Sequence, residues 1–229
     1  MKLIFLHGAG NTGLVWHYQT EYFKDSEAIN LPGHPEGKPR TSIEQYTEWF
    51  HKYVHSKGYS QLIIAGHSMG GAVAQAYALS YPQDVKALIL IGTGSRLRVS
   101  SDFLKLLEGG INEPAGWLKD MIEPLYSGVA HDVKEKVING VAQVGVAVQL
   151  HDFRCCDKFD IVDKVSQIAV PTLVICGAED NMTPVKYSQY LVNQIAGARL
   201  VTVEGSTHHC FIEKPVEVNR AIEEFLKNL

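Results

Sequence analysis

Short apolar runs and longer amphipathic stretches alternate along the first part of the chain. Four runs are almost continuously apolar, without the alternation of a half-solvated strand: residues 3–6, 28–31, 62–65 and 85–91. Three stretches between them have helix-like spacing: residues 14–23, 43–57 and 68–81. Ser42 and Gln45 form a capping box at the start of the second stretch. Buried strands that alternate with helices are typical of a parallel sheet covered on both faces.

Residues 95–165 follow a different pattern, with helical stretches and no convincing strand. Five valines recur at the spacing of one helix face and predict a single helix: residues 133, 137, 141, 144 and 148. Strand and helix patterns then resume in four segments: residues 172–176, 184–195, 199–203 and 215–229. We therefore expect an α/β core of residues 1–94 and 166–229, with a mostly parallel sheet of about six strands covered by helices on both faces. A helical lid of residues 95–165 is expected to be inserted after the fourth strand.

The composition is that of an ordinary globular protein, and it narrows the possible partners. Of 229 residues, 45% are hydrophobic and 20% are charged, which argues against disorder and against a coiled coil. The net charge of −4, with no basic cluster beyond Arg96 and Arg98, argues against nucleic acid as a partner. No apolar run reaches the ~18 residues of a membrane span, and the run at residues 1–6 is too short for a signal peptide. We therefore expect a cytoplasmic monomer or small homo-oligomer with no membrane partner.

The four cysteines show neither a C-x-x-C pair nor a spacing typical of metal ligands: Cys155, Cys156, Cys176 and Cys210. Four reduced thiols and no metal site are the expectation. Cys155 and Cys156 lie next to Phe153 and Phe159 in the sequence, and we expect them to pack beneath the lid.

The segment Gly66-His67-Ser68-Met69-Gly70 matches G-x-S-x-G and lies between a predicted strand and a predicted helix. A nucleophilic serine in this context occupies a sharp turn that lifts its hydroxyl above the sheet edge. The alternative is a glycine-rich turn with an incidental serine. The strand before the motif and the helix after it favour Ser68 as a nucleophile.

A serine nucleophile needs a base, and the base needs a carboxylate that orients it. In this type of fold, the acid and then the histidine follow the serine along the chain. Asp180 comes just after the strand predicted at 172–176, and the neighbouring Glu179 is its rival. His208 and His209 both follow the last predicted strand, so the residues themselves leave the choice of base open.

Five segments together resemble the α/β-hydrolase superfamily, in its lidded serine esterase-like branch. They occur in the family's order and span nearly the whole chain: Leu6-His7-Gly8-Ala9-Gly10 with Trp16, Leu31-Pro32-Gly33-His34, Gly66-His67-Ser68-Met69-Gly70-Gly71, Pro171-Thr172-Leu173 continuing to Gly177 and Asp180, and Gly205-Ser206-Thr207-His208 with Glu213 and Pro215. In this family the catalytic histidine lies five residues before the glutamate of a final E-x-P, so the resemblance selects His208. The chain departs from the pattern in two ways. It lacks two initial antiparallel strands, and it has Asn30 where aspartate is common.

The resemblance also implies an oxyanion hole made of the backbone N–H groups of Ala9 and Met69, aimed at the charge that develops on the substrate oxygen. The glycine-rich loop at residues 7–13 does not match a phosphate-binding motif. It has neither G-x-G-x-x-G with a suitably placed acidic residue nor the Lys-Ser/Thr of a P-loop. No cofactor is expected.

The expected chemistry is hydrolysis of a small-molecule ester through an acyl-enzyme on Ser68, with Asp180 and His208 completing the triad. A serine nucleophile argues against dehalogenases and epoxide hydrolases, which use aspartate there in this family. An apolar pocket for short-chain carboxylic esters is expected beneath the lid, lined by five side chains: Leu104, Trp117, Met121, Leu125 and Met182.

Other reactions remain open with the same triad: hydrolysis of a C–C bond or a thioester, and perhydrolase activity. A different class of function is a lidded ligand-binding receptor with little turnover. Repeated turnover of an activated ester distinguishes an enzyme from such a receptor.

Overall fold

The computed structural model describes residues 1–229 and is built on one six-stranded sheet. Every pair of neighbouring strands runs parallel, in the order β2-β1-β3-β4-β5-β6. The strands are β1 (Lys2–Leu6), β2 (Ser26–Ile29), β3 (Leu62–His67), β4 (Val85–Ile91), β5 (Thr172–Gly177) and β6 (Arg199–Val203). The predicted parallel sheet of six strands is confirmed. Because all strands point the same way, the loops after their carboxyl ends meet at one edge.

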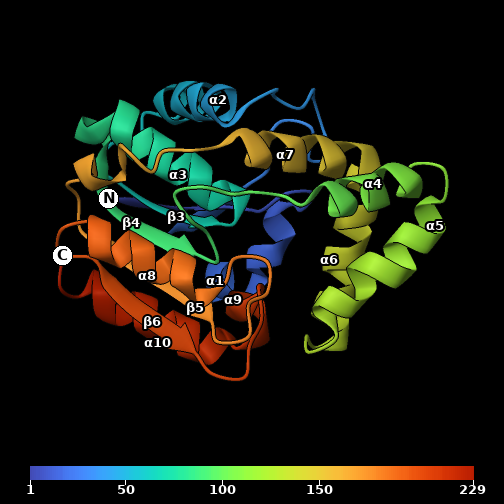
Figure 1. The fold of residues 1–229 in the computed structure, drawn as a ribbon. Helices are drawn as coiled ribbons and strands as arrows, with labels where there is room; N and C mark the ends of the chain where they lie inside the picture. The colour runs from blue at the N-terminus through green and yellow to red at the C-terminus, as the bar shows by residue number, and fades with distance from the viewer.

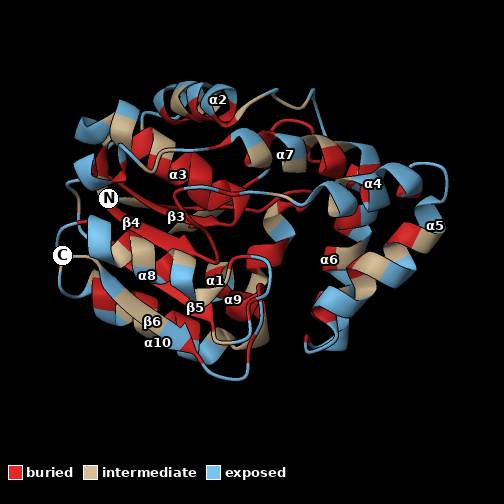
Figure 2. Cartoon of the chain, viewed as in Figure 1, coloured by how far each residue is buried: buried red, intermediate tan, exposed pale blue.

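Helices cover both faces of the sheet, and the buried strands lie between them (Figures 1 and 2). Within the α/β core these are α1 (His17–Tyr22), α2 (Ile43–Ser56), α3 (Met69–Ser80), α8 (Val185–Gln194), α9 (Cys210–Glu213) and α10 (Pro215–Leu226). Successive strand residues point to opposite faces, so each face has its own core. Ile4 and Leu6 pack with residues of α2, α3 and α8, whereas Leu3 and Phe5 pack with residues of α9 and α10.

Four helices are inserted between β4 and β5 and gather beyond the carboxyl ends of the strands (Figure 1). They are α4 (Ser101–Gly110), α5 (Pro114–Trp117), α6 (His131–Val144) and α7 (Val146–Lys158). The single helix predicted through Val148 is wrong, because the chain breaks at Gly145, whose φ of 80° ends α6. Val133, Val137 and Val141 are buried on α6 as predicted, but Val148 belongs to α7. None of the helices is both long and apolar enough to cross a membrane.

Two elements near the N-terminus differ from the predictions. The helix predicted at 14–23 begins with a tight 3-10 turn, Gly13–Trp16, which precedes α1. The strand predicted at 28–31 is β2, which begins and ends two residues earlier because Ser26 to Ile29 pair with β1. Asn30 then leaves the sheet, and its Oδ1 accepts the Gly13 N–H at 2.7 Å.

The capping box at the start of α2 is formed with one change of partner. Ser42 Oγ accepts the Gln45 N–H at 3.3 Å, as expected. The Gln45 side chain accepts the N–H of Thr41 instead of that of Ser42, at 3.2 Å.

Candidate active site

Ser68 lies in a strained turn between β3 and α3. Its φ of 50° and ψ of −116° place a non-glycine residue in a sparsely populated region of backbone space. A Cβ atom on Gly66 would lie 2.3 Å from the carbonyl oxygen of Gly70, and one on Gly70 would lie 2.3 Å from that of Leu6. Only glycine fits at either position, so both motif glycines are needed to bring α3 this close to the sheet. Strain at a serine held in this way is typical of a functional position.

Asp180 and His208 lie next to each other at the carboxyl edge of the sheet, on the loops after β5 and β6. The two side chains are joined by a 2.9 Å hydrogen bond from His208 Nδ1 to Asp180 Oδ2. The N–H groups of Met182 and Thr183 donate to Oδ1 at 2.9 and 2.8 Å, and the Thr183 hydroxyl donates to Oδ2 at 2.8 Å. Burial raises the pKa of Asp180, but His208 and these hydrogen bonds outweigh burial and lower it. The carboxylate is therefore ionised at neutral pH and orients the imidazole.

Glu179 and Glu213 lie near this pair of residues, but their hydrogen bonds are with other groups. Glu179 is exposed, and its N–H donates to the Ser206 carbonyl oxygen at 3.0 Å. The Glu213 carboxylate accepts the N–H of Thr207 at 2.7 Å and the Thr207 hydroxyl at 2.5 Å. Glu213 thus holds the loop just before His208, which is a physical reason for its fixed spacing from the histidine.

His209 is buried and forms no hydrogen bond with Asp180; it contacts Tyr126 instead. Its Nε2 is 3.4 Å from the hydroxyl of Tyr126, and its Nδ1 has no hydrogen-bond partner. Burial, followed by the nearby His208, lowers the pKa of His209 to about 3. His209 is therefore neutral at physiological pH and packs between Tyr126 and His67.

Ser68 and His208 open into the same cavity, which has a volume of about 450 Å³ and lies between the core and the inserted helices. Of its 17 lining residues, 10 are hydrophobic, so the wall is largely apolar. The hydrogen bonds of His208 run to Asp180 and Thr183, and none joins it to Ser68 in this structure. Catalytic hydrogen bonds are often long or poorly aligned in an enzyme without substrate and tighten when substrate binds.

Three of the five side chains predicted for the pocket line this cavity: Met121, Leu125 and Met182. Leu104 and Trp117 do not. Trp117 is buried, and its indole N–H donates to Gln149 at 2.7 Å, so the polar end of the ring is used inside the protein. Gln149 and Phe153 of α7 line the cavity instead. In the sequence, nothing separates this glutamine and this phenylalanine from others that do not line the cavity.

The predicted oxyanion donors both lie near Ser68. Met69 is the first residue of α3, so its N–H has no acceptor within the helix. The N–H of Ala9 donates to no protein group, and Ala9 borders a small cavity together with Ser68 and His208. Gly10 follows with a φ of 66°, and a Cβ there would lie 2.6 Å from Gln149 Cγ. The loop after β1 therefore passes close beneath α7.

Asp152 holds this loop from the inserted helix α7, a contact that the sequence did not reveal. The carboxylate is completely buried. Its Oδ2 accepts the Gly10 N–H at 2.9 Å and lies 2.7 Å from His34 Nε2, while its Oδ1 accepts the Tyr46 hydroxyl at 3.0 Å. His34 Nδ1 faces the carbonyl oxygens of Leu31 and Pro32, each at 3.2 Å. Asp152 therefore links the loop after β1, the loop after β2 and helix α2 through three buried hydrogen-bonding groups.

Replacement of Asp152 with alanine is expected to lower the free energy of unfolding by at least about 3 kcal/mol, because it leaves three buried polar groups, on Gly10, His34 and Tyr46, without their partner. The matched control is Tyr46→Phe, which removes one hydrogen bond to the same carboxylate and should cost about 1 kcal/mol. Urea unfolding followed by circular dichroism measures both changes. Equal losses in the two variants would mean that Asp152 contributes no more than a single hydrogen bond.

Comparison with known proteins places this chain in a family. Residues 3–221 match the Alpha/beta hydrolase family. The chain therefore belongs to that family. Monoacylglycerol lipase abhd6-A of Xenopus laevis is 26% identical over 257 residues, which cover 100% of this chain and 76% of that protein. (E)-2-((N-methylformamido)methylene)succinate hydrolase of Acinetobacter baylyi is 23% identical, over 98% of this chain and 90% of that protein.

Solved structures lead to the same conclusion. A thermophilic esterase is 32% identical and superposes with a TM-score of 0.81, over 99% of this chain and 89% of the other. An esterase from Exiguobacterium antarcticum superposes with a TM-score of 0.88 at 19% identity, over 99% and 92% of the two chains, which is a likeness of fold. The protein is a hydrolase of the α/β family, with esterases and lipases among its relatives.

Proposed function

We propose that the protein hydrolyses short-chain carboxylic esters through an acyl-enzyme on Ser68. The observation that carries this proposal is that a serine in a strained turn opens into the same cavity as the Asp180–His208 pair. The hydrogen bond to Asp180 occupies Nδ1 of His208, so the imidazole presents Nε2 as its free nitrogen. Residues in this arrangement suit nucleophilic catalysis by a serine with a general base.

In the first half of the reaction, Ser68 Oγ attacks the ester carbonyl carbon and His208 Nε2 takes the hydroxyl proton. Asp180 holds the neutral imidazole as the Nδ1–H tautomer and stabilises the imidazolium that forms. The N–H groups of Ala9 and Met69 donate to the oxygen that becomes negatively charged, and the N-terminus of α3 adds a favourable dipole. His208 then gives its proton to the departing alcohol, which leaves the acyl group on Ser68.

In the second half, water replaces the alcohol. His208 accepts a proton from the water as it attacks the acyl carbonyl carbon, and returns that proton to Ser68 Oγ when the bond to the acid breaks. The reaction is a hydrolysis in which no group is oxidised or reduced. The positions of Ser68, His208 and Asp180 therefore support a complete cycle with the side chains of this chain alone.

The apolar cavity supports a short acyl group as the preferred substrate. The inserted segment provides apolar wall near Ser68 through four side chains: Leu97, Phe103, Met121 and Leu125. A volume of about 450 Å³ lies in the lower part of the ~300–1,000 Å³ range of small-molecule sites. The inserted helices thus serve as the lid of the proposed pocket.

The rate should rise with acyl length until this pocket is filled and then fall. Burial of one methylene contributes about 0.8 kcal/mol, or roughly fourfold in kcat/KM, whereas overpacking costs about 1–3 kcal/mol. We expect an optimum near butyrate to hexanoate and a steep decline by decanoate or laurate. Steady-state kinetics with nitrophenyl esters from acetate to laurate measure this profile.

Two outcomes of the same experiment contradict the proposal in different ways. A rate that continues to rise to laurate would mean that the lid is open or mobile and that the enzyme acts like a lipase. At most a single turnover of every ester would indicate a ligand-binding receptor instead of an esterase.

A further inference from the structure

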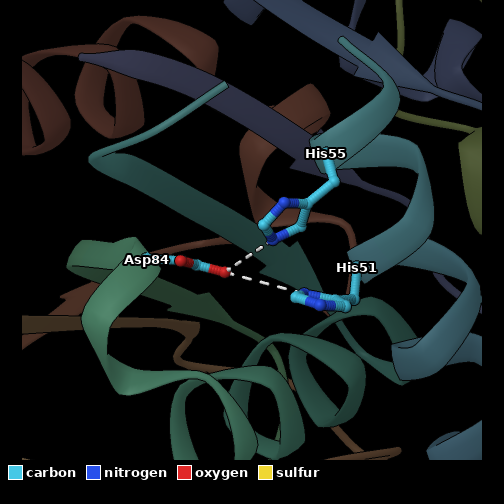
Figure 3. A group of neighbouring side chains, drawn as sticks. All are labelled: His51, His55 and Asp84. Carbon is cyan, nitrogen blue, oxygen red and sulfur yellow. Dashed lines mark ion pairs between the residues drawn. The ribbon is translucent and has the colours of Figure 1, made fainter. Parts of the chain in front are cut away.

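Two histidines and an aspartate converge on the surface at the end of α3 that is far from Ser68 (Figure 3). His51 and His55 are one helical turn apart on α2, and both rings point toward the carboxylate of Asp84. Asp84 lies in the short 3-10 turn Pro82–Asp84, between α3 and β4. Ser68 precedes α3 and Asp84 follows it, so a helix of 12 residues, about 18 Å long, separates this cluster from the nucleophile.

The spacing of the three side chains is compatible with a bound metal, and in its absence the Tyr77 hydroxyl lies 3.3 Å from His51 Nδ1. Asp84 Oδ2 lies 3.6 Å from His51 Nδ1 and 3.5 Å from His55 Nε2. Hydrogen bonds between nitrogen and oxygen are about 2.7–3.2 Å long, so neither contact is a good one. Tetrahedral zinc with bonds of about 2.1 Å holds its ligand atoms about 3.4 Å apart. The three candidate ligand atoms all lie within 4.8 Å of one another, so small side-chain rotations bring them around one ion.

Neighbouring tyrosines hold two of the three side chains in place. The Tyr77 hydroxyl donates to Asp84 Oδ2 at 2.9 Å, and the ring of Tyr81 stacks on His51 with centroids 3.7 Å apart and an angle of 3° between the planes. Burial, followed by the hydrogen bond to Asp84, raises the pKa of Tyr77, so its phenol remains a hydrogen-bond donor. Metal sites commonly have such outer partners, which orient the ligands and limit the entropy lost on binding.

The cluster is accessible to an ion from solvent and leaves room for further ligands. The exposed fractions of the His51, His55 and Asp84 side chains are 27%, 58% and 17%. Imidazole and carboxylate donors suit Zn²⁺ and its neighbours in the first transition series, whereas Mg²⁺ and Ca²⁺ prefer sites made of oxygen ligands alone.

We propose that His51, His55 and Asp84 bind a divalent transition-metal ion, with Zn²⁺ the best match and a water molecule as the fourth ligand. His51 binds through Nδ1 and therefore carries its proton on Nε2 in the bound state. The ion connects α2 to the segment between α3 and β4, and it stabilises the folded state because it binds the folded chain in preference to the unfolded one. The site is separate from Ser68. Its ion takes no part in ester hydrolysis.

Calorimetric titration of tag-free protein with zinc chloride tests this assignment. We expect one zinc ion per chain, and a loss of affinity of at least about 10-fold in His55→Ala, since removal of even an outer partner of a metal ligand costs that much. His131→Ala is the matched control. His131 is an exposed histidine on another helix, α6, and it also has a possible ligand one turn away: its Nδ1 lies 3.8 Å from Glu135 Oε2. The control should bind zinc like the unchanged protein.

Two further measurements distinguish this site from ordinary surface binding. Zinc should raise the melting temperature of the unchanged protein and of His131→Ala, but not that of His55→Ala. Cobalt(II) should produce the absorption bands of a four-coordinate ion in the first two proteins only. Equal zinc affinity in His55→Ala and the unchanged protein, or zinc binding that is lost in His208→Ala instead, would overturn the assignment.

Discussion

The replacement of Ser68 by alanine should lower kcat by roughly 10³–10⁶ while the fold stays intact. The hydroxyl is the proposed nucleophile, so its loss removes the covalent route and leaves only substrate binding and the two backbone donors at Ala9 and Met69. The fold should tolerate the change because alanine is smaller than serine and the turn is imposed by close backbone packing at Gly66 and Gly70.

Steady-state kinetics with nitrophenyl butyrate measure this loss, and circular dichroism checks the fold. Ser127→Ala is the matched control, since Ser127 is an exposed serine of the inserted segment, and it should change kcat by less than about twofold. More than a tenth of the original turnover in a Ser68→Ala sample free of contaminating enzyme would rule out Ser68 as the nucleophile.

Alanine at His208 should abolish activity, whereas alanine at His209 should cost less than about tenfold in kcat. Only His208 contacts Asp180, and its loss removes both the general base and the general acid of the proposed cycle. His209 faces Tyr126 and is neutral at physiological pH, because burial and the nearby His208 lower its pKa to about 3. Its role is therefore packing.

The two variants are to be compared per folded molecule, because His209 is buried and its removal also affects stability. Urea unfolding gives the fraction of each variant that is folded, and this fraction gives the concentration of folded enzyme. The kcat per folded molecule is then measured with nitrophenyl butyrate. Reversed effects, with His209→Ala inactive and His208→Ala active, would require a different triad.

Much of the candidate site could be predicted from the sequence, because its determinants are local. The backbone at Ser68 is shaped by glycines two residues away on either side, and the strand before and the helix after it show their own periodicities. Asp180 follows directly from the end of a buried strand, where side chains reach the carboxyl edge of the sheet. The order of the two residues along the chain and their positions at strand ends were therefore enough to predict that Ser68 and Asp180 lie at the same edge of the sheet.

The choice between His208 and His209 depended on the resemblance to a family, since two adjacent loop residues have no periodicity that separates them. The structure shows the physical difference. Glu213 holds the backbone and the hydroxyl of Thr207, and the loop then directs His208 toward Asp180 and His209 toward Tyr126.

Other features were decided only by tertiary packing, because their partners are far apart in the sequence. Asp152 contacts Gly10 and His34 across 142 and 118 residues, and no local pattern on α7 distinguishes this buried carboxylate from a solvated one. The hydrogen bond from the indole of Trp117 to Gln149 likewise joins residues that are 32 positions apart.

The break at Gly145 and the His51–His55–Asp84 cluster also depend on long-range packing. The valine spacing continued through residue 148, but packing of α6 and α7 on different parts of the core required the chain to turn at a glycine with positive φ. Two histidines one turn apart were visible on the predicted helix at 43–57, yet their third partner comes from 29 residues further along. Periodicity determined the strands and most helices, and a local glycine motif determined the turn at Ser68, whereas the contacts between distant side chains arose only when the elements packed together.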